Sequence, residues 1–189
     1  MANKQMTDRR VGLVLSATDN GGYFFADAPS DVFCPECRSV LDRSYHPKKL
    51  TVKKHLDIGV TYDNRKICTP RFKSWLEETF PRQLAFWIVN DDPLMYFFEP
   101  LPQLRFDTER RKTEFLSRCH KCSQFREVIG ATPAFLKDKG ADLSEGIFRT
   151  DIEFGSREGK APLYLVPLTF KEHVQRERFS GLVLADVLE

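Results

Sequence analysis

"SRCHKCSQFRE", residues 117–127, places two cysteines two residues apart, and "CPEC", residues 34–37, repeats the same spacing. A Cys-x-x-Cys turn lets two thiolates point at one ion, and two such turns supply the four soft ligands that a tetrahedral Zn²⁺ prefers. The pattern predicts one zinc site of the zinc-ribbon type. Its ligands would be Cys34, Cys37, Cys119 and Cys122.

The two pairs are far apart in the chain, because residues 38–118 lie between them. An ordinary zinc ribbon has only about 15–20 residues at this place. Loop-closure entropy grows only logarithmically with length, so a long insertion is tolerated if it folds and brings its own ends together. The alternatives are a redox-active dithiol and thiols without a shared role, with disulfides disfavoured in a reducing cytosol. A zinc ion with four thiolates has no open position, which predicts a structural ion.

Two further residues near this pattern are predicted to play no part in the site. His120 lies inside the second pair, but four cysteines already complete the ligand shell, so we expect it to face solvent. Cys68 is the odd fifth cysteine. It aligns with a valine in the internal comparison below, which predicts a buried and inert thiol.

Composition is that of a packed globular protein. The chain has 189 residues, of which 41% are hydrophobic and 30% charged, and we expect residues 1–189 to form a single compact domain. The sequence contains no run of 18 apolar residues, which argues against a membrane span. No apolar stretch follows the charged N-terminus, so the expected location is the cytoplasm. The net charge of +2 indicates no particular partner.

Residues 69–81 carry the clearest helix signal. Thr69 is a typical N-cap, Pro70 a typical first helical residue, and the apolar side chains that follow recur at helical spacing until Pro81. Aromatic and β-branched residues at 84–89 and 94–100 predict strands around an "NDDP" turn. Near the N-terminus, residues 11–16 and 22–27 flank "TDNGG" and predict a hairpin.

The C-terminal region repeats this order of elements. Aligning Phe72 with Phe170 pairs Leu84 with Leu182 and Cys68 with Val166, without a gap. The expected fold class is therefore α+β, with mainly antiparallel strands and two similar strand-helix-strand segments, at residues 60–100 and 143–189. Residues 28–45 together with 112–130 would form the zinc-ribbon-like part.

Motifs for catalysis are missing from the sequence. The four histidines stand at 46, 55, 120 and 173, outside any nucleophile or metalloenzyme motif, and neither a Walker A nor a Rossmann glycine pattern occurs. We therefore expect a protein that is not an enzyme. Lysine and arginine gather in residues 43–54 and 110–126, which allows two interpretations: a solvated surface, or a basic face that attracts nucleic acid.

With these features, the chain resembles the double-CXXCG motif immunity proteins of bacterial toxin–immunity systems. The resemblance covers most of the chain from about residue 20, and its most informative part is the tail, with "LSEGIFR" followed by "LYLVPLTFKEHV" and "FSGLVLADV". Residues that match the tail pattern are Leu143, Phe148, Arg149, Phe170, Gly181 and Leu182. Arg38 and Ser123 stand where the family has a glycine after each cysteine pair, a position where a tight turn favours positive φ.

The resemblance implies a protein that binds and neutralises a cognate toxin without catalytic residues. The leading hypothesis is thus a zinc-stabilised immunity protein in the cytoplasm, with a protein toxin as its partner. One alternative is a zinc-ribbon nucleic-acid-binding protein that uses residues 43–54 and 110–126. A thiol redox enzyme is a third.

Overall fold

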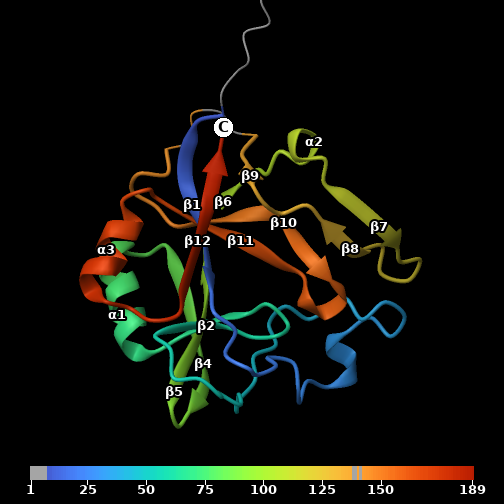
Figure 1. The fold of residues 1–189 in the computed structure, drawn as a ribbon. Coiled ribbons are helices and arrows are strands. Elements are labelled where there is room, and N and C mark those ends of the chain that lie inside the picture. The colour runs from blue at the N-terminus through green and yellow to red at the C-terminus, as the bar shows by residue number, and fades with distance from the viewer. Residues whose placement is uncertain (1–7, 138–139, 141) are drawn as a thin grey trace, which may run out of the picture.

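The structure is a computed structural model that describes residues 8–137, 140 and 142–189. In this part of the chain, three α-helices accompany two mainly antiparallel sheets (Figure 1). The predicted α+β class with mostly antiparallel strands is confirmed.

The larger sheet has the strand order β7-β8-β10-β11-β1-β12-β9, with β6 beside β10. Only the pairs β12–β9 and β10–β6 are parallel. In spatial order the strands are β7 (Glu114–Arg118), β8 (Phe125–Ile129), β10 (Phe148–Ser156), β11 (Ala161–Val166), β1 (Arg10–Ala17), β12 (Leu182–Leu188) and β9 (Ala134–Phe135), and β6 is Gln103–Leu104.

The smaller sheet has four strands in the order β2-β3-β5-β4, all antiparallel to their neighbours. They are β2 (Ile58–Val60), β3 (Lys66–Cys68), β5 (Leu94–Pro100) and β4 (Leu84–Asp91). Aromatic side chains are frequent on β4 and β5, as expected for half-buried strands.

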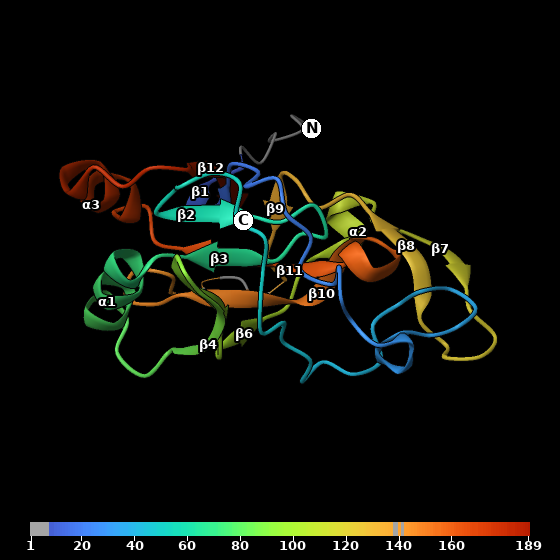
Figure 2. The same ribbon diagram turned by 90° about the horizontal axis from the view of Figure 1, so that it is seen from below.

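Helix α1 (Pro70–Thr79) begins where the sequence predicts. The Thr69 side chain accepts a hydrogen bond from the amide of Phe72 at 3.4 Å, and Pro70 occupies the first turn. Helix α3 (Phe170–Glu177) lies at the same end of the molecule, and α2 (Thr108–Arg111) is a single turn before β7 (Figures 1 and 2).

Each of the longer helices connects two strands of one sheet. Helix α1 follows β3 and precedes β4, and β5 lies between these strands. Helix α3 follows β11 and precedes β12, and β1 lies between them. Because the intervening strand is antiparallel to both neighbours, the two strands joined by each helix run parallel.

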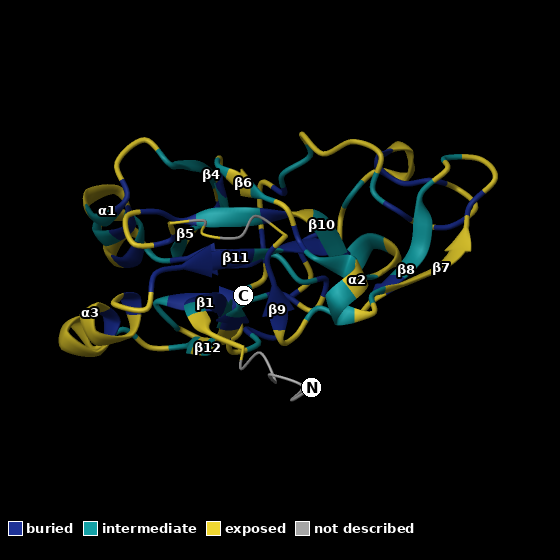
Figure 3. Ribbon diagram, turned by 90° about the horizontal axis from the view of Figure 1, so that it is seen from above, coloured by how far each residue is buried: buried dark blue, intermediate teal, exposed yellow. Residues whose placement is uncertain are grey.

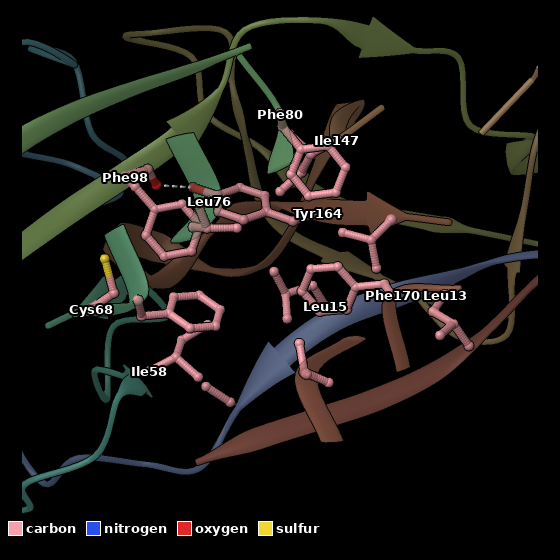
Figure 4. Packing of buried hydrophobic residues seen from close by; sticks show 14 residues of the cluster. Leu13, Leu15, Ile58, Cys68, Leu76, Phe80, Phe98, Ile147, Tyr164 and Phe170 are labelled. Carbon is pink, nitrogen blue, oxygen red and sulfur yellow. Dashed lines mark hydrogen bonds between the residues drawn. The ribbon is translucent and has the colours of Figure 1, made fainter. Parts of the chain in front are cut away.

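One hydrophobic cluster fills the space between the sheets and the two helices. Phe72, on α1, and Phe170, on α3, are almost fully buried, and the Phe170 ring stacks on that of Phe80 with centroids 6.2 Å apart. The Tyr164 hydroxyl donates a hydrogen bond to the Phe98 carbonyl oxygen at 2.8 Å, which joins β11 to β5 (Figure 4). Figure 3 shows the result, with buried β1 and β11 and outer helix faces that are exposed.

Gly181 is required where the two sheets meet before β12. Its φ is 90°, and a Cβ atom there would lie 2.0 Å from the Ile58 carbonyl oxygen. Any side chain at this position would be strained by the positive φ and would clash with the Ile58 carbonyl oxygen.

The predicted N-terminal hairpin is wrong in its second half. Residues 11–16 lie within β1, but residues 22–27 contain no strand, and residues 24–27 form a turn. The reason is a buried carboxylate: Asp63 accepts hydrogen bonds from the amides of Phe24 and Phe25, at 2.9 and 2.8 Å. These amides are then not available for pairing with another strand, and the two phenylalanines pack into a separate aromatic cluster.

Candidate metal centre

The four cysteines of the two pairs converge on one point. Their sulfur atoms all lie within 4.8 Å of one another, with 3.8 Å between Cys34 and Cys119 and 3.5 Å between Cys37 and Cys122. All four are free thiols. A tetrahedron of sulfur atoms about 2.3 Å from a central ion has edges of about 3.8 Å, so the arrangement fits a metal ion.

The first cysteine turn follows the 3₁₀ helix η1 (Ser30–Val32). The Cys34 amide donates to the Ser39 carbonyl oxygen at 2.9 Å, and the Arg38 amide donates back to the Cys34 carbonyl oxygen at 2.9 Å. Arg38 has a φ of 65°. This closed turn directs both of its sulfur atoms to the same side.

The second turn, between β7 and β8, has the same hydrogen bonds. The Cys119 amide donates to the Gln124 carbonyl oxygen at 2.8 Å, and the Ser123 amide donates to the Cys119 carbonyl oxygen at 2.9 Å. Ser123 has a φ of 61°, so the two positions where the resembling family has glycine both adopt a glycine-like conformation. Figures 1 and 2 both show the blue segment of the first turn beside the yellow end of the β7–β8 hairpin.

Lys160 joins the two turns to the larger sheet. It follows the 3₁₀ helix η2 (Arg157–Gly159) and is buried. Its ammonium group donates to Ser39 Oγ at 3.0 Å, to Gln124 Oε1 at 3.2 Å and to the Phe125 carbonyl oxygen at 2.5 Å. One cation therefore holds both turns and lies near a group of thiols that become anionic when they bind a metal.

Sequence reasoning missed Lys160 because nothing in its local sequence distinguishes it from other lysines. It is distant in sequence from both cysteine pairs, and only the strand order of the larger sheet brings it to them.

The environment of the thiols affects their ionisation. Burial raises the pKa of Cys37, but hydrogen bonds with Ser39 and with the neighbouring thiols outweigh it and lower the pKa to about 6. Burial and the adjacent thiols raise the pKa of Cys122 to about 12. Of these two thiols, Cys37 therefore loses its proton more readily than Cys122.

The two residues predicted to stay outside the site do so. His120 is exposed, and the group of potential metal ligands contains only the four cysteines. Cys68 lies in the main hydrophobic cluster with no exposed surface, and burial raises the pKa of its thiol. Cys68 is therefore an inert core residue.

Several residues of the basic segments are engaged within the protein. Arg43 pairs with Glu153 at 2.6 Å, Arg110 pairs with Asp8, and Arg111 donates to the Thr132 carbonyl oxygen at 2.9 Å. Others project into solvent. They are Lys48, Lys49, Lys53, Lys112 and Lys121. Lys54 and Arg118 are exposed as well, but they donate to the carbonyl oxygens of Asp19 and Ser123, at 2.8 and 3.3 Å.

A metal ion bound by all four thiolates would have no free position for water or substrate. The geometry therefore fits an ion that holds two segments together. In the described part of the chain, no helix is long and apolar enough to cross a membrane. Comparisons of the chain with protein-family models, with curated proteins and with solved structures found no match.

Proposed function

We propose that this is a zinc-stabilised, non-enzymatic binding protein, and specifically an immunity protein that neutralises a cognate bacterial toxin by direct contact. The observation that carries the proposal is the convergence of four thiols from two turns that are remote in the sequence. An ion held by all four thiolates would join two distant segments and leave no open position for a substrate, which suits a role in binding.

Zinc is the proposed ion because of the donor set. Four thiolates in a near-tetrahedral arrangement are soft ligands, and among divalent ions zinc tolerates this geometry without a further ligand. Cys34, Cys37, Cys119 and Cys122 would hold the ion. The ion would hold the two cysteine turns together and neutralise part of the negative charge of the thiolates.

An exposed pair of tyrosines is the proposed contact surface. Tyr23 and Tyr62 are 57% and 55% exposed, and their ring centroids lie 4.9 Å apart. The Tyr62 amide donates to the Gly22 carbonyl oxygen at 2.9 Å, and the neighbouring carboxylate of Asp63 holds the chain after Tyr23 through the two amide bonds described above. Tyrosines held on rigid turns are typical of the residues that dominate binding energy in protein interfaces.

The charge near these tyrosines indicates the chemistry of the partner. The aliphatic part of Lys53 lies against Gly21, and Lys54 donates to the Asp19 carbonyl oxygen at 2.8 Å. Both lysines are exposed. An acidic surface on the toxin would complement this edge and increase the rate of association.

We also propose that the two strand-helix-strand segments, residues 60–100 and 143–189, are related units of one domain spanning residues 1–189. Support comes from the equivalent positions of the two helices. Each helix connects two parallel strands of one sheet, and a third strand lies between those two strands in the sheet. The aligned residues Phe72 and Phe170 are also both buried in the shared cluster.

The zinc proposal is tested by elemental analysis of protein purified from cells. We expect about one zinc ion per chain, and loss of the ion from Cys34→Ser. Protein with all four thiols reduced and without bound metal would contradict the zinc site.

The immunity proposal is tested with the inactive form of the secreted protein encoded beside this gene. We expect direct binding by calorimetry, weakened by roughly 100-fold or more in the double variant Tyr23→Ala with Tyr62→Ala. Leu101→Ala is the matched control, because Leu101 is equally exposed, at 56%, and lies after β5. Absence of binding by the wild type would refute immunity toward that toxin, whereas unchanged binding by the double variant would refute only the surface.

The alternative function is nucleic-acid binding through residues 43–54 and 110–126. The exposed lysines of both segments support it. Binding of an oligonucleotide that weakens steeply with salt would favour this alternative, because released counterions give such binding its salt dependence.

A further inference from the structure

A groove of about 350 Å³ lies between α3 and β12. Its floor is apolar and consists of Val174, Phe179, Leu182 and Leu184. Val174 is buried, and the Phe179 ring packs edge-on against the Phe72 ring with centroids 4.9 Å apart. Figures 2 and 3 show α3 and β12 side by side along one rim of the molecule. The groove is therefore a surface feature with a helix as one wall, a strand as the other and a well-packed floor.

The strand beside this groove has an open edge. One side of β12 pairs with β1 along the whole strand, whereas on the other side β9 pairs only with Val187 and Leu188. Among the described residues, no strand pairs with residues 182–186 on that side. This stretch has no proline or lysine, and its one charged residue, Asp186, is paired with Arg10 at 3.3 Å. Natural proteins usually protect an open edge with such residues, so an apolar edge without them is suited to pairing with a further strand.

The main-chain groups of two leucines point to this open edge. The Gly181 carbonyl oxygen accepts a hydrogen bond on the β1 side, and the Leu188 carbonyl oxygen accepts one from the Leu136 amide, at 3.3 Å, on the β9 side. Successive residues of a strand direct their N–H and C=O groups to opposite sides, so Leu182 and Leu184 share the direction of Leu188. In an antiparallel pair, directly opposite residues have their side chains on the same face. A residue paired with Leu184 would therefore direct its side chain into the groove.

Two unpaired cations border the groove. Lys171 and Arg178 line it and are exposed, and neither side chain has a hydrogen bond or ion pair within the described part of the chain. The acidic residues of α3, Glu172 and Glu177, do not line the groove, and no other described carboxylate does. The charge of the groove is therefore positive, which complements an acidic partner.

The distance between the two cations fits an extended chain. A helix rises about 10 Å over the seven residues from Lys171 to Arg178. Two strand residues four positions apart are separated by about 13 Å and have side chains on the same face. The residue midway between them shares that face and would lie over the apolar floor. Long, flexible lysine and arginine side chains accommodate the small difference in length.

We propose that an extended segment of a partner protein pairs antiparallel with residues 182–186, with an apolar side chain in the groove and an acidic residue two positions to either side of it. Main-chain hydrogen bonds would provide affinity, and the floor and the two cations would provide selectivity. A second copy of this chain fits less well, because pairing of two β12 edges would bring Lys171 and Arg178 of both copies together. This inference stands apart from the proposed immunity function, since it uses neither the metal centre nor the Tyr23–Tyr62 surface.

The probe is a synthetic peptide with blocked ends, Thr-Asp-Thr-Val-Thr-Asp-Thr, in which the valine and both aspartates share one face. We expect it to bind with a Kd of about 0.1 mM or below, which calorimetry or NMR titration measures. A peptide with lysine in place of both aspartates, and one with serine in place of valine, should each bind about tenfold more weakly or worse.

Methylation of single peptide amides tests the strand pairing without any protein variant. The valine amide would donate to β12, so its methylation should weaken binding about tenfold or more. The amide of the preceding threonine would face away from β12, and its methylation should have little effect. In the wild-type protein, bound peptide should slow hydrogen exchange at the amides of Leu182 and Leu184. The amide of Val183 faces β1 and should change little.

A protein variant tests the charge. Lys171→Glu should weaken binding of the acidic peptide about tenfold or more. Arg176→Glu is the matched control, because it makes the same change of charge at an exposed position of α3 that does not line the groove.

Four results would overturn the proposal. They are no binding of the acidic peptide at about 1 mM, equal binding of the two methylated peptides, equal losses from Lys171→Glu and Arg176→Glu, and a stable dimer of the free protein that protects the amides of Leu182 and Leu184.

Discussion

Lys160 is a residue that contacts both cysteine turns. Its ammonium group donates three hydrogen bonds, one to the first turn and two to the second. Outer partners of this type orient metal ligands, and their loss commonly weakens metal binding by about 10–100-fold.

We therefore expect Lys160→Met to weaken metal affinity by this factor, since methionine fills similar space without a charge or donors. Competition with a chromogenic chelator measures the change. Lys171→Met, on the exposed face of α3, is the control. A folded Lys160→Met protein with wild-type affinity would show that Lys160 does not support the site.

Lys66 is a second buried cation, with 5% of its surface exposed, and its ammonium group lies 4.3 Å from the centre of the Tyr164 ring. Burial, with a smaller effect of Arg65, lowers its pKa from 10.5 to about 8. The unfolded chain thus binds a proton between about pH 8 and 10.5 that the folded chain does not. The free-energy cost of burying the charged Lys66 side chain is fully present below about pH 8 and disappears as pH rises through this window, so the protein becomes more stable.

A comparison of the wild type with Lys66→Met isolates this effect, because methionine does not titrate. Relative to the variant, the wild-type free energy of unfolding should increase by about 2 kcal/mol between pH 7 and 9.5. Denaturant unfolding at several pH values measures it. Parallel stability curves for the two proteins would show that Lys66 remains charged in the fold.

At the scale of elements, the two long helices differ in how they begin. Thr69 caps α1 through its side chain, whereas Thr169, before α3, makes no such bond. We expect Thr69→Ala to destabilise the protein by about 1 kcal/mol, because the Phe72 amide loses its acceptor.

Thr169→Ala is the matched control and should change stability by less than about 0.5 kcal/mol. Thermal and denaturant unfolding measure both variants, and Thr69→Ser should restore the wild-type value. Equal losses from both alanine variants would indicate that packing at the helix starts, and not the cap, sets the cost.

At the scale of the whole molecule, the metal centre joins segments that other interactions hold less well. Residues 20–57 contain little regular structure, and β7 is an exposed edge strand (Figure 3). The smaller sheet and α1 instead share the main hydrophobic cluster. Removal of the metal should therefore loosen one end of the molecule selectively.

Hydrogen exchange with and without a chelator tests this expectation. The amides of Cys34, Arg38, Cys119 and Ser123 should exchange faster without metal, while those of β3, β5 and α1 keep most of their protection. Restored zinc should reverse the change. Equal acceleration throughout the protein would show instead that the metal stabilises the entire fold.

Local signals predict much of this protein because their physics is local. Thr69 and Pro70 define the start of α1 through bonds within a single turn, and the spacing of each cysteine pair fixes a turn that directs two sulfur atoms to one side. The strand predicted at residues 22–27 is wrong because that prediction also used only local signals. Their aromatic pattern is typical of a strand, but the amides of Phe24 and Phe25 donate hydrogen bonds to the carboxylate of Asp63, which is distant in the chain.

The sequence by itself determined the α+β composition, the capped helix and the identity of the four thiols, since each depends on residues a few positions apart. Only the tertiary structure decided that the two cysteine pairs meet and that Lys160 joins them. These features depend on strand order, and strand order follows from the burial of side chains along the entire chain. Neighbouring residues alone do not encode it.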